Sequence, residues 1–463
     1  MSTDAPDTAT AAASAGRVRP GVLARYAIGS LGTGGFSTLP GLVLTYYLTD
    51  SLGVAAIVAG LVITLAKVWD VVIDPVIGAL SDHDLAQHGS RRRWMLVGVS
   101  LLPLFFALTC AVPPAVGPVA AAIWALVAFL LTATAFSLFQ VPYIALPAEL
   151  TAGYDERTRL LTWRVVVLTF AILLFGAGGP ALRDALSDPA MGYLVMGIAS
   201  GVVIGAGMIV ATTVARRRPG GAGAGEGAAG AARSGTIRAH YAAAFAAVRR
   251  SAPFRALLTT YLLQALATGL MLAGAQYVAT WVLHSQAAVT LLFVALIAPA
   301  IFAAPAWGAL ARRIGKERSF AVASALFALA ALSILGLQWA PGDWVYLPVA
   351  IAGVAYAGMQ SLPMAMLPDV ISHDERANGP GRAGSFSGMW TAGETVGFAL
   401  GAGILSLVLA MTGYVSSTAG TTVTQPAAAV TGIVVAFSVV PAALIAVSLA
   451  TLARYRLRRH DIG

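Results

Sequence analysis

The sequence predicts an all-α polytopic membrane protein with twelve transmembrane helices in two halves of six. Of its 463 residues, 58% are hydrophobic and only 11% are charged, and the mean hydropathy is +0.80. A soluble globular chain carries about a quarter charged residues, so this composition excludes a water-soluble protein. The apolar residues also gather in long runs, and a membrane helix needs about 20 of them in sequence.

Twelve such runs follow one another, at residues 22–49, 53–81, 93–112, 118–148, 159–182, 190–215, 254–283, 287–311, 318–338, 344–368, 384–413 and 428–453. A Gly/Ala-rich stretch of the flexible-linker type separates the sixth run from the seventh. We therefore expect a disordered tail at 1–20, an N-terminal half at 21–215, a linker at 216–252, a C-terminal half at 253–454 and a second tail at 455–463.

The basic residues predict the orientation of the chain in the membrane. Alternate loops carry nearly all the arginines and lysines, whereas the other set of loops carries only Arg183. Positive loops stay in the cytoplasm, so we expect both termini and the linker to be cytoplasmic, in a plasma (inner) membrane. This distribution also accounts for the net charge of +9 without a basic domain, and no nucleic-acid partner is expected.

The two halves repeat each other weakly. Residues 75–80 share a Pro-x-x-Gly-Ala-Leu pattern with residues 305–310, and residues 142–149 share a Pro-x-x-x-Leu-Pro pattern with residues 363–369. Each pair lies at the same place in its half. These repeated motifs occur in two halves whose basic loops lie on the same side of the membrane. Together they favour two parallel six-helix repeats related by an axis along the membrane normal.

Three ionisable side chains, Lys67, Asp70 and Asp74, lie within the second apolar run. Spacings of three and four residues place them on one face of a helix. Burying such a charge in lipid costs about 2.5–3.5 kcal/mol, so the face is expected to point into the bundle. Two carboxylates there can bind Na⁺ or a proton, with Lys67 as the charge partner when no cation is bound. The alternative is an ion pair that only holds helices together.

Three motifs resemble those of the glycoside-pentoside-hexuronide:cation symporter family, in the major facilitator superfamily. They are the Lys67–Gly78 stretch, the Gln140–Tyr143 stretch, and Ser361–Val370 with the Gly379-x-x-Arg382-x-Gly384 pattern after it. The resemblance implies the major facilitator fold and sugar uptake coupled to Na⁺, H⁺ or Li⁺. We see no catalytic constellation, so an enzyme is not expected.

The resemblance also implies roles for single residues. Asp70 and Asp74 match the acids that bind the coupling cation, and Gln140 stands where the family has a third acid. Arg164 matches an arginine that contacts sugar. The family's sugar-binding aspartate falls on the Gly34–Gly35 pair, and a lysine of helix 11 falls on Thr395 beside Glu394. The sugar site of the family is therefore not preserved.

Polar residues inside other apolar runs complete the candidate sites. Those that could face a central substrate cavity are Arg164, Gln264, Tyr277, Trp390, Thr391 and Glu394. Charged residues at the expected cytoplasmic ends could form bridges between the halves that act as gates. They are Asp82, Arg92, Asp155, Arg157, Asp369, Asp374 and Arg376. Ordinary solvated surface charge is the alternative for this second set.

The expected function is cation-coupled symport of a sugar or similar small polar solute by alternating access, in a monomer with no cofactor besides the coupling ion. Three alternatives stay open. A cavity without sugar anchors suits a lysolipid or another amphipathic solute. Proton-driven efflux uses the same fold. A non-transporting membrane receptor is the alternative from outside the transporters.

Overall fold

The computed structural model describes residues 18–113, 115–151, 154–215, 249–378, 383–419, 421, 423–455 and 457. These residues contain twelve helices that are long and apolar enough to cross a membrane. The predicted number of spans is thereby confirmed. Most of the expected tails and linker, at 1–17, 216–248 and 458–463, lies outside the described residues.

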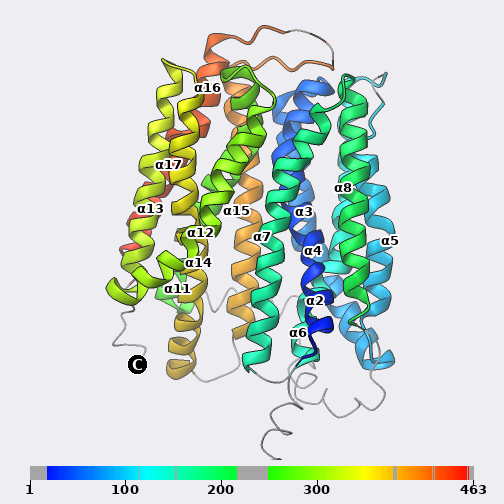
Figure 1. Ribbon diagram of the computed structural model, residues 1–463, viewed down its shortest axis with the longest axis vertical. Coiled ribbons are helices and arrows are strands. Elements are labelled where there is room, and N and C mark those ends of the chain that lie inside the picture. The colour runs from blue at the N-terminus through cyan, green and yellow to red at the C-terminus, as the bar shows by residue number, and fades with distance from the viewer. Residues whose placement is uncertain are drawn as a thin grey trace, which may run out of the picture.

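Among the described residues, six of the spans belong to the N-terminal half, which lies toward the right of Figure 1. Its helices are α2 (Pro20–Ile28) and α3 (Ser30–Tyr46), which form the first span with the π-helical turn η1 (Tyr47–Ser51), then α4 (Ala56–His88), α5 (Arg92–Thr109), α6 (Pro118–Leu150), α7 (Tyr154–Asp184) and α8 (Pro189–Thr212). Several helices continue past their apolar runs. α4 extends to His88, for example, because its polar last turns still satisfy backbone hydrogen bonds within the helix.

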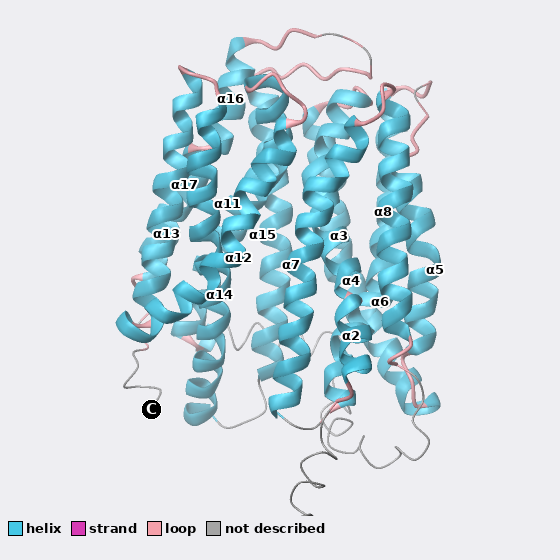
Figure 2. Ribbon diagram, in the orientation of Figure 1, coloured by secondary structure: helices cyan, strands magenta, loops and turns pink. Residues whose placement is uncertain are grey.

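The C-terminal half also consists of six spans. Its elements are α11 (Ala252–Tyr277) with the π-helical turn η2 (Val278–Val282), α12 (Ala288–Ile314), α13 (Lys316–Ser333) with the 3₁₀ turn η3 (Ile334–Gln338), the 3₁₀ turn η4 (Asp343–Val345) before α14 (Tyr346–Asn378), α15 (Ala383–Met411), and α16 (Ala427–Phe437) with α17 (Val439–Leu452). Helices account for nearly all of the described chain, as Figure 2 shows.

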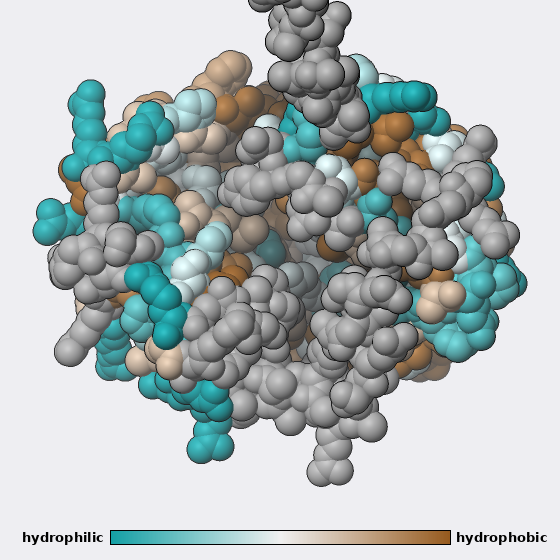
Figure 3. Space-filling view, turned by 90° about the horizontal axis from the view of Figure 1, so that it is seen from below, coloured by the Kyte–Doolittle hydropathy of each residue, from teal (hydrophilic) through white to brown (hydrophobic). Residues whose placement is uncertain are grey.

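The bundle has two distinct ends. We call the end that holds Pro20, Arg92 and Lys316 the arginine-rich end, and the end that holds Ser51 and Ala427 the opposite end. The arginine-rich end is at the bottom of Figure 1. Seen from that end in Figure 3, the surface has a recess near its centre, partly covered by grey atoms.

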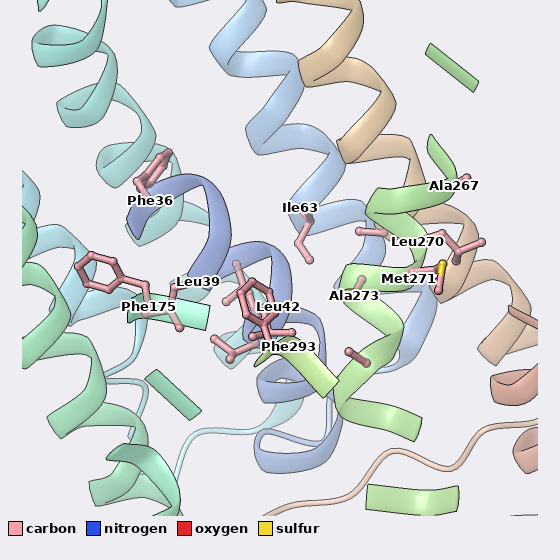
Figure 4. Close-up of a cluster of buried hydrophobic side chains, with 14 of the residues drawn as sticks. Phe36, Leu39, Leu42, Ile63, Phe175, Ala267, Leu270, Met271, Ala273 and Phe293 are labelled. Atoms are coloured by element: carbon pink, nitrogen blue, oxygen red, sulfur yellow. The ribbon is translucent and has the colours of Figure 1, made fainter. Parts of the chain in front are cut away.

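In the described chain, the main helix contacts between the halves are α3 with α11, α4 with α15, and α7 with α12. The pairing is reciprocal, because the second helix of each half contacts the fifth helix of the other. Small residues allow close approach. A Cβ added at Gly60 of α4 would lie 2.5 Å from Ser406 Cβ of α15. Figure 4 shows the apolar core at this junction, where Leu42 of α3 lies beside Phe293 of α12.

Candidate functional site

Lys67 and Asp70 form an ion pair on α4. Lys67 Nζ donates to Asp70 Oδ2 at 3.0 Å, and Asp70 is buried. Lys67 Nζ also lies 5.3 Å from the ring centroid of Phe36 on α3. The three-residue spacing therefore produces an ion pair inside the N-terminal half, within the membrane-spanning part of α4.

Two carboxylate oxygens at this site have unused bonding capacity. Asp70 Oδ1 and Asp74 Oδ1 are buried, and neither accepts a hydrogen bond from any described residue. A buried charged oxygen without a partner is costly. Both oxygens are hard ligands, the type that small cations such as Na⁺ prefer, and either can instead take a proton.

Helix α6 provides polar groups beside these acids. The buried Ser137 hydroxyl lies beside the Asp74 side chain. Gln140 lies one turn further along α6, and its Oε1 accepts a 2.8 Å hydrogen bond from Thr33 of α3. The sequence reasoning missed Ser137. The signal was its spacing of three residues from Gln140, which places both on one face of α6.

Arg164 of α7 lies in the same half. Its guanidinium packs over the ring of Tyr143, 5.6 Å from the centroid. The Tyr143 hydroxyl is in turn held by hydrogen bonds of 2.8 Å to the Tyr26 carbonyl and 3.0 Å with Ser30. Arg164 Nε is buried and has no hydrogen-bond acceptor among the described residues. A positioned N–H group of this kind can bind an oxygen atom of a solute.

The place of the family's sugar-binding aspartate is filled by helix packing. A Cβ added at Gly34 would lie 2.6 Å from Ala171 Cβ and 3.0 Å from the Leu168 carbonyl oxygen, both on α7. No larger side chain fits there without separating α3 from α7. The expectation that this anchor is missing therefore has a steric basis as well as a sequence basis.

Three candidates from α15 lie along one helix, and two of them contact the same tyrosine. Glu394 Oε1 accepts a 2.8 Å hydrogen bond from the Tyr261 hydroxyl of α11. The Tyr261 ring stacks on Trp390 with centroids 4.1 Å apart. Trp390 is buried, and its Nε1 has no acceptor within the described chain. Thr391 is exposed. The structure thus brings Trp390 and Glu394 together through Tyr261, which the sequence did not single out.

The other two candidates of the C-terminal half lie elsewhere. Gln264 Nε2 donates to Ser324 at 2.8 Å and to Ser448 at 3.2 Å, so this side chain joins α11 to α13 and α17. Tyr277 lies at the opposite end of the bundle, where its hydroxyl bonds Thr49 at 2.7 Å. Gln264 is therefore mainly a contact within its half, and Tyr277 is a contact between the halves.

Two of the predicted gating residues at the arginine-rich end, Asp82 and Asp369, form ion pairs within their own halves. Arg91 bonds Asp82 and contacts Glu149 Oε1 at 2.5 Å, which ties α4, α5 and α6 together. Burial raises the pKa of Glu149 above its ordinary value despite the adjacent guanidinium. In the other half, Lys316 Nζ lies 2.5 Å from Asp369 Oδ2. These pairs organise each half separately.

The remaining gating candidates differ in environment. Arg92 Nε is buried and has no acceptor in the part of the chain that the structure describes. Asp374 is buried, whereas Arg376 is exposed and donates to the Ser372 carbonyl at 3.3 Å. The side chains of Asp155 and Arg157 lie outside the described residues.

The opposite end is held shut by a network that the sequence did not predict. Tyr414 donates to Asp50 Oδ1 at 2.5 Å, and Trp281 Nε1 donates to the Tyr414 hydroxyl at 2.8 Å. Thr49 bonds both Asp50 and Tyr277. We call these five residues the Asp50 network. Burial and then the nearby Asp50 charge raise the pKa of Tyr414, so its hydroxyl keeps the proton that it donates.

Backbone hydrogen bonds reinforce this closure. Ser417 N–H donates to the Thr49 carbonyl at 2.9 Å, and Ala419 N–H donates to the Ser51 carbonyl at 3.0 Å. Arg183 of α7 adds a 3.1 Å bond to Gln276 Oε1 of α11. The hydrogen bonds between described residues of the two halves thus gather at the opposite end, away from Asp70 and Asp74.

Comparison with known proteins identifies relatives along most of the chain. A family model described as MFS/sugar transport protein matches residues 25–459. Among solved structures, the nucleoside transporter NupG superimposes with a TM-score of 0.65 at 13% identity, covering 95% of this chain and 99% of that one. At this identity the likeness concerns the fold alone. Together these findings confirm the major facilitator fold expected from the sequence.

Curated relatives include proteins named as symporters. The chain is 37% identical over 126 residues to the uncharacterized symporter sll1374 of Synechocystis sp., which is 26% of this chain and 23% of that protein. It is 31% identical over 169 residues to the putative glycoside/cation symporter YagG of Escherichia coli, or 35% and 36% of the two chains. These alignments span well under half of either relative. A 23% identical alignment covers 85% of this chain and 84% of the glucuronide carrier protein homolog of Escherichia coli.

Proposed function

This chain belongs to the family of MFS/sugar transport proteins, and we propose that it is a secondary transporter that couples the movement of Na⁺ or H⁺ to that of a sugar or similar small polar solute. The observation that carries the proposal is the pair of buried oxygens, Asp70 Oδ1 and Asp74 Oδ1, that no described group satisfies. The Lys67–Asp70 ion pair engages only Asp70 Oδ2, so both of these oxygens stay available to a cation or a proton.

The cation is proposed to bind between α4 and α6. Asp70, Asp74 and the Ser137 hydroxyl supply oxygen ligands, and the Gln140 amide is positioned on the same face of α6. Lys67, now bonded to Asp70 at 3.0 Å, would lose part of its attraction when a cation arrives. Cation binding would thereby alter the contact of α4 with its neighbours, which links the ion to the conformation of the half.

Alternating access is proposed to proceed by rocking of the two halves. The Asp50 network closes the opposite end, and we assign the arginine-rich end to the cytoplasm by the positive-inside rule. The described conformation would then open inward. Arg164 from the N-terminal half and Trp390, Thr391 and Glu394 from the C-terminal half are the proposed contacts for solute.

The test is uptake into proteoliposomes that contain the purified protein. A panel of sugars and glucuronides is offered with an imposed Na⁺ gradient, with a proton gradient or with neither. The parent is expected to accumulate a solute under one gradient, and the double variant Asp70→Asn, Asp74→Asn is expected to lose that accumulation. Asp343→Asn, which removes an exposed acid at the opposite end, is the matched control.

Two results would contradict the proposal. If the double variant accumulates solute as the parent does, the acids of α4 are structural. If no sugar moves under either gradient, the panel is repeated with lysolipids and with efflux from preloaded vesicles, and movement there supports the alternative cargo or direction.

A further inference from the structure

We propose that Glu394 is a proton-binding site of the C-terminal half, separate from the cation site at Asp70 and Asp74, and that it gains and loses one proton in the transport cycle. The inference rests on the proposed transport function. It starts from a chain of four side chains that runs from α15 through α11 to α14: Glu394, Tyr261, Gln360 and Tyr356.

With the Gln360 amide oriented as it is, a proton on Glu394 completes the hydrogen bonds of this chain. The Tyr261 hydroxyl lies 2.8 Å from Glu394 Oε1 and 3.0 Å from Gln360 Oε1. Both of those atoms are acceptors, yet a tyrosine hydroxyl has one hydrogen to give. Gln360 Nε2 already donates to the Tyr356 hydroxyl at 2.6 Å. Every contact is satisfied when Glu394 is protonated and donates to Tyr261, which then donates to Gln360.

Loss of the proton would reverse the whole chain. An ionised Glu394 can only accept, so the Tyr261 hydroxyl must turn to it. The Gln360 amide must then flip to donate to Tyr261, and Tyr356 must donate to Gln360. Protonation therefore sets the direction of hydrogen bonding across three helices, and the cooperativity of such chains makes the two directions distinct states.

Glu394 has no charged partner among the described residues. Within the described part of the chain it forms no ion pair, and its polar contacts are with neutral groups. The elements packed against α15 carry titratable groups along their whole lengths, and of these Tyr261 bonds Glu394 directly. They are Arg255, Tyr261 and Tyr277 on α11, Tyr46 on α3, Lys67, Asp70, Asp74, Asp82, His83, Asp84 and His88 on α4, and Tyr346, Tyr356, Asp369, His373, Asp374, Glu375 and Arg376 on α14. Lys67 is engaged by Asp70. An uncompensated negative charge at this depth is costly, which favours the protonated carboxyl.

A small cavity borders this chain of side chains. It measures about 10 Å³ and is bordered by Tyr261, Gln264, Thr268, Tyr356, Gln360 and Phe398, which is room for about one water molecule. Gln264 Oε1 is buried there and has no donor among the described residues. Glu394 itself is partly exposed. The cavity can therefore hold one water molecule beside Tyr261, Gln360 and Tyr356, which is a candidate carrier for the proton.

The test is infrared titration of the full-length protein in liposomes, with the proton as the only ligand. A protonated carboxylic acid has a carbonyl stretch distinct from that of a carboxylate. Glu394→Gln is expected to remove one such band from the pH-difference spectrum. Asp343→Asn and the Asp70→Asn, Asp74→Asn variant are expected to keep it. A Glu394→Gln spectrum identical to that of the parent at every pH would overturn the proposal.

A second variant covers the case in which Glu394→Gln does not fold. Tyr261→Phe keeps the carboxyl and removes the hydroxyl that bonds it, so the Glu394 band is expected to shift in frequency. An unshifted band would overturn the chain. Because the infrared measurement needs no transported solute, its outcome is independent of the uptake assay. A lost gradient response in the α4 variants and a lost band in Glu394→Gln are therefore separate results.

Discussion

Tyr414 and Asp50 are 364 residues apart in the chain and share a 2.5 Å hydrogen bond that joins the two halves of the protein. A hydrogen bond to a charged group contributes about 1.5–3 kcal/mol. It also connects Trp281, which donates to the Tyr414 hydroxyl, to the first span. The Asp50 network is therefore expected to set how often the opposite end opens.

Removing the Tyr414 hydroxyl should favour opening at that end. In a Cys110→Ser background, a cysteine placed at the buried Ala279 reports access from the opposite end to a membrane-impermeant maleimide. Tyr414→Phe is expected to raise the labelling rate about tenfold, since about 1.4 kcal/mol corresponds to a factor of ten. Tyr346→Phe, in the same half but outside the network, is the control. Equal rates in the parent and Tyr414→Phe would show that this bond does not hold the closure.

Ser137 should contribute directly to cation affinity. Ser137→Ala removes a neutral oxygen beside Asp74 without changing the charge of the site. The cation concentration for half-maximal uptake is expected to rise about tenfold, as for the loss of one hydrogen bond to a charged partner, with little change in maximal rate. The control is Ser200→Ala, a buried serine of α8. An unchanged cation dependence would remove Ser137 from the site.

A larger residue at Gly60 should hold α4 away from α15. A Cβ at this position would lie 2.5 Å from Ser406 Cβ, so Gly60→Val cannot fit the closed packing. A Cβ built at Gly403 lies 3.2 Å from the Thr64 hydroxyl, so cysteines introduced at Thr64 and Gly403 are expected to form a disulfide when Gly60 is present. The disulfide is expected to form several-fold more slowly when Gly60→Val is added. Gly117→Val, where no atom lies within 4 Å, should leave the rate unchanged.

Glu149 should make thermal stability depend on pH. Its pKa is raised by burial in the folded state, so the folded protein holds this proton more tightly than the unfolded chain does. The resulting stabilisation is complete below the ordinary glutamate pKa and is lost as pH rises through the raised value. The apparent Tm of the parent in detergent is expected to fall by a few degrees over that range. Glu149→Gln should flatten this change and Glu317→Gln should not. A parent curve that matches Glu149→Gln would contradict the assignment.

The sequence predicted the features that depend on neighbours along one helix. Apolar runs predicted twelve spans, and the spacing of Lys67 and Asp70 predicted their ion pair. The last span was expected to be continuous, yet it divides at Ser438. Pro441 accounts for the break, because it has no N–H to donate to the carbonyl of Phe437 and its ring clashes there.

Contacts between distant helices could not be predicted in the same way. Tyr277 is a polar aromatic residue within an apolar run, which suggested a cavity position, but only the packing of α3 against α11 places it beside Thr49. Tyr261 carries no charge and matched no motif, although it connects Glu394 to Trp390. Such roles depend on which faces meet in three dimensions, and a single sequence does not contain that information in its local pattern.

The backbone hydrogen bonds between residues 49–51 and 417–419 stabilise the closed opposite end in a way that side-chain substitution does not remove. Every residue except proline supplies the same N–H and C=O groups, so the energy of these bonds is nearly independent of which amino acids occupy the loop. Variation in Thr49, Asp50, Tyr277 or Tyr414 can adjust the lifetime of the closed end around that constant contribution. Evolution could therefore adjust the rate of the transport cycle by exchanging a few side chains, while the backbone hydrogen bonds that close this end stayed the same.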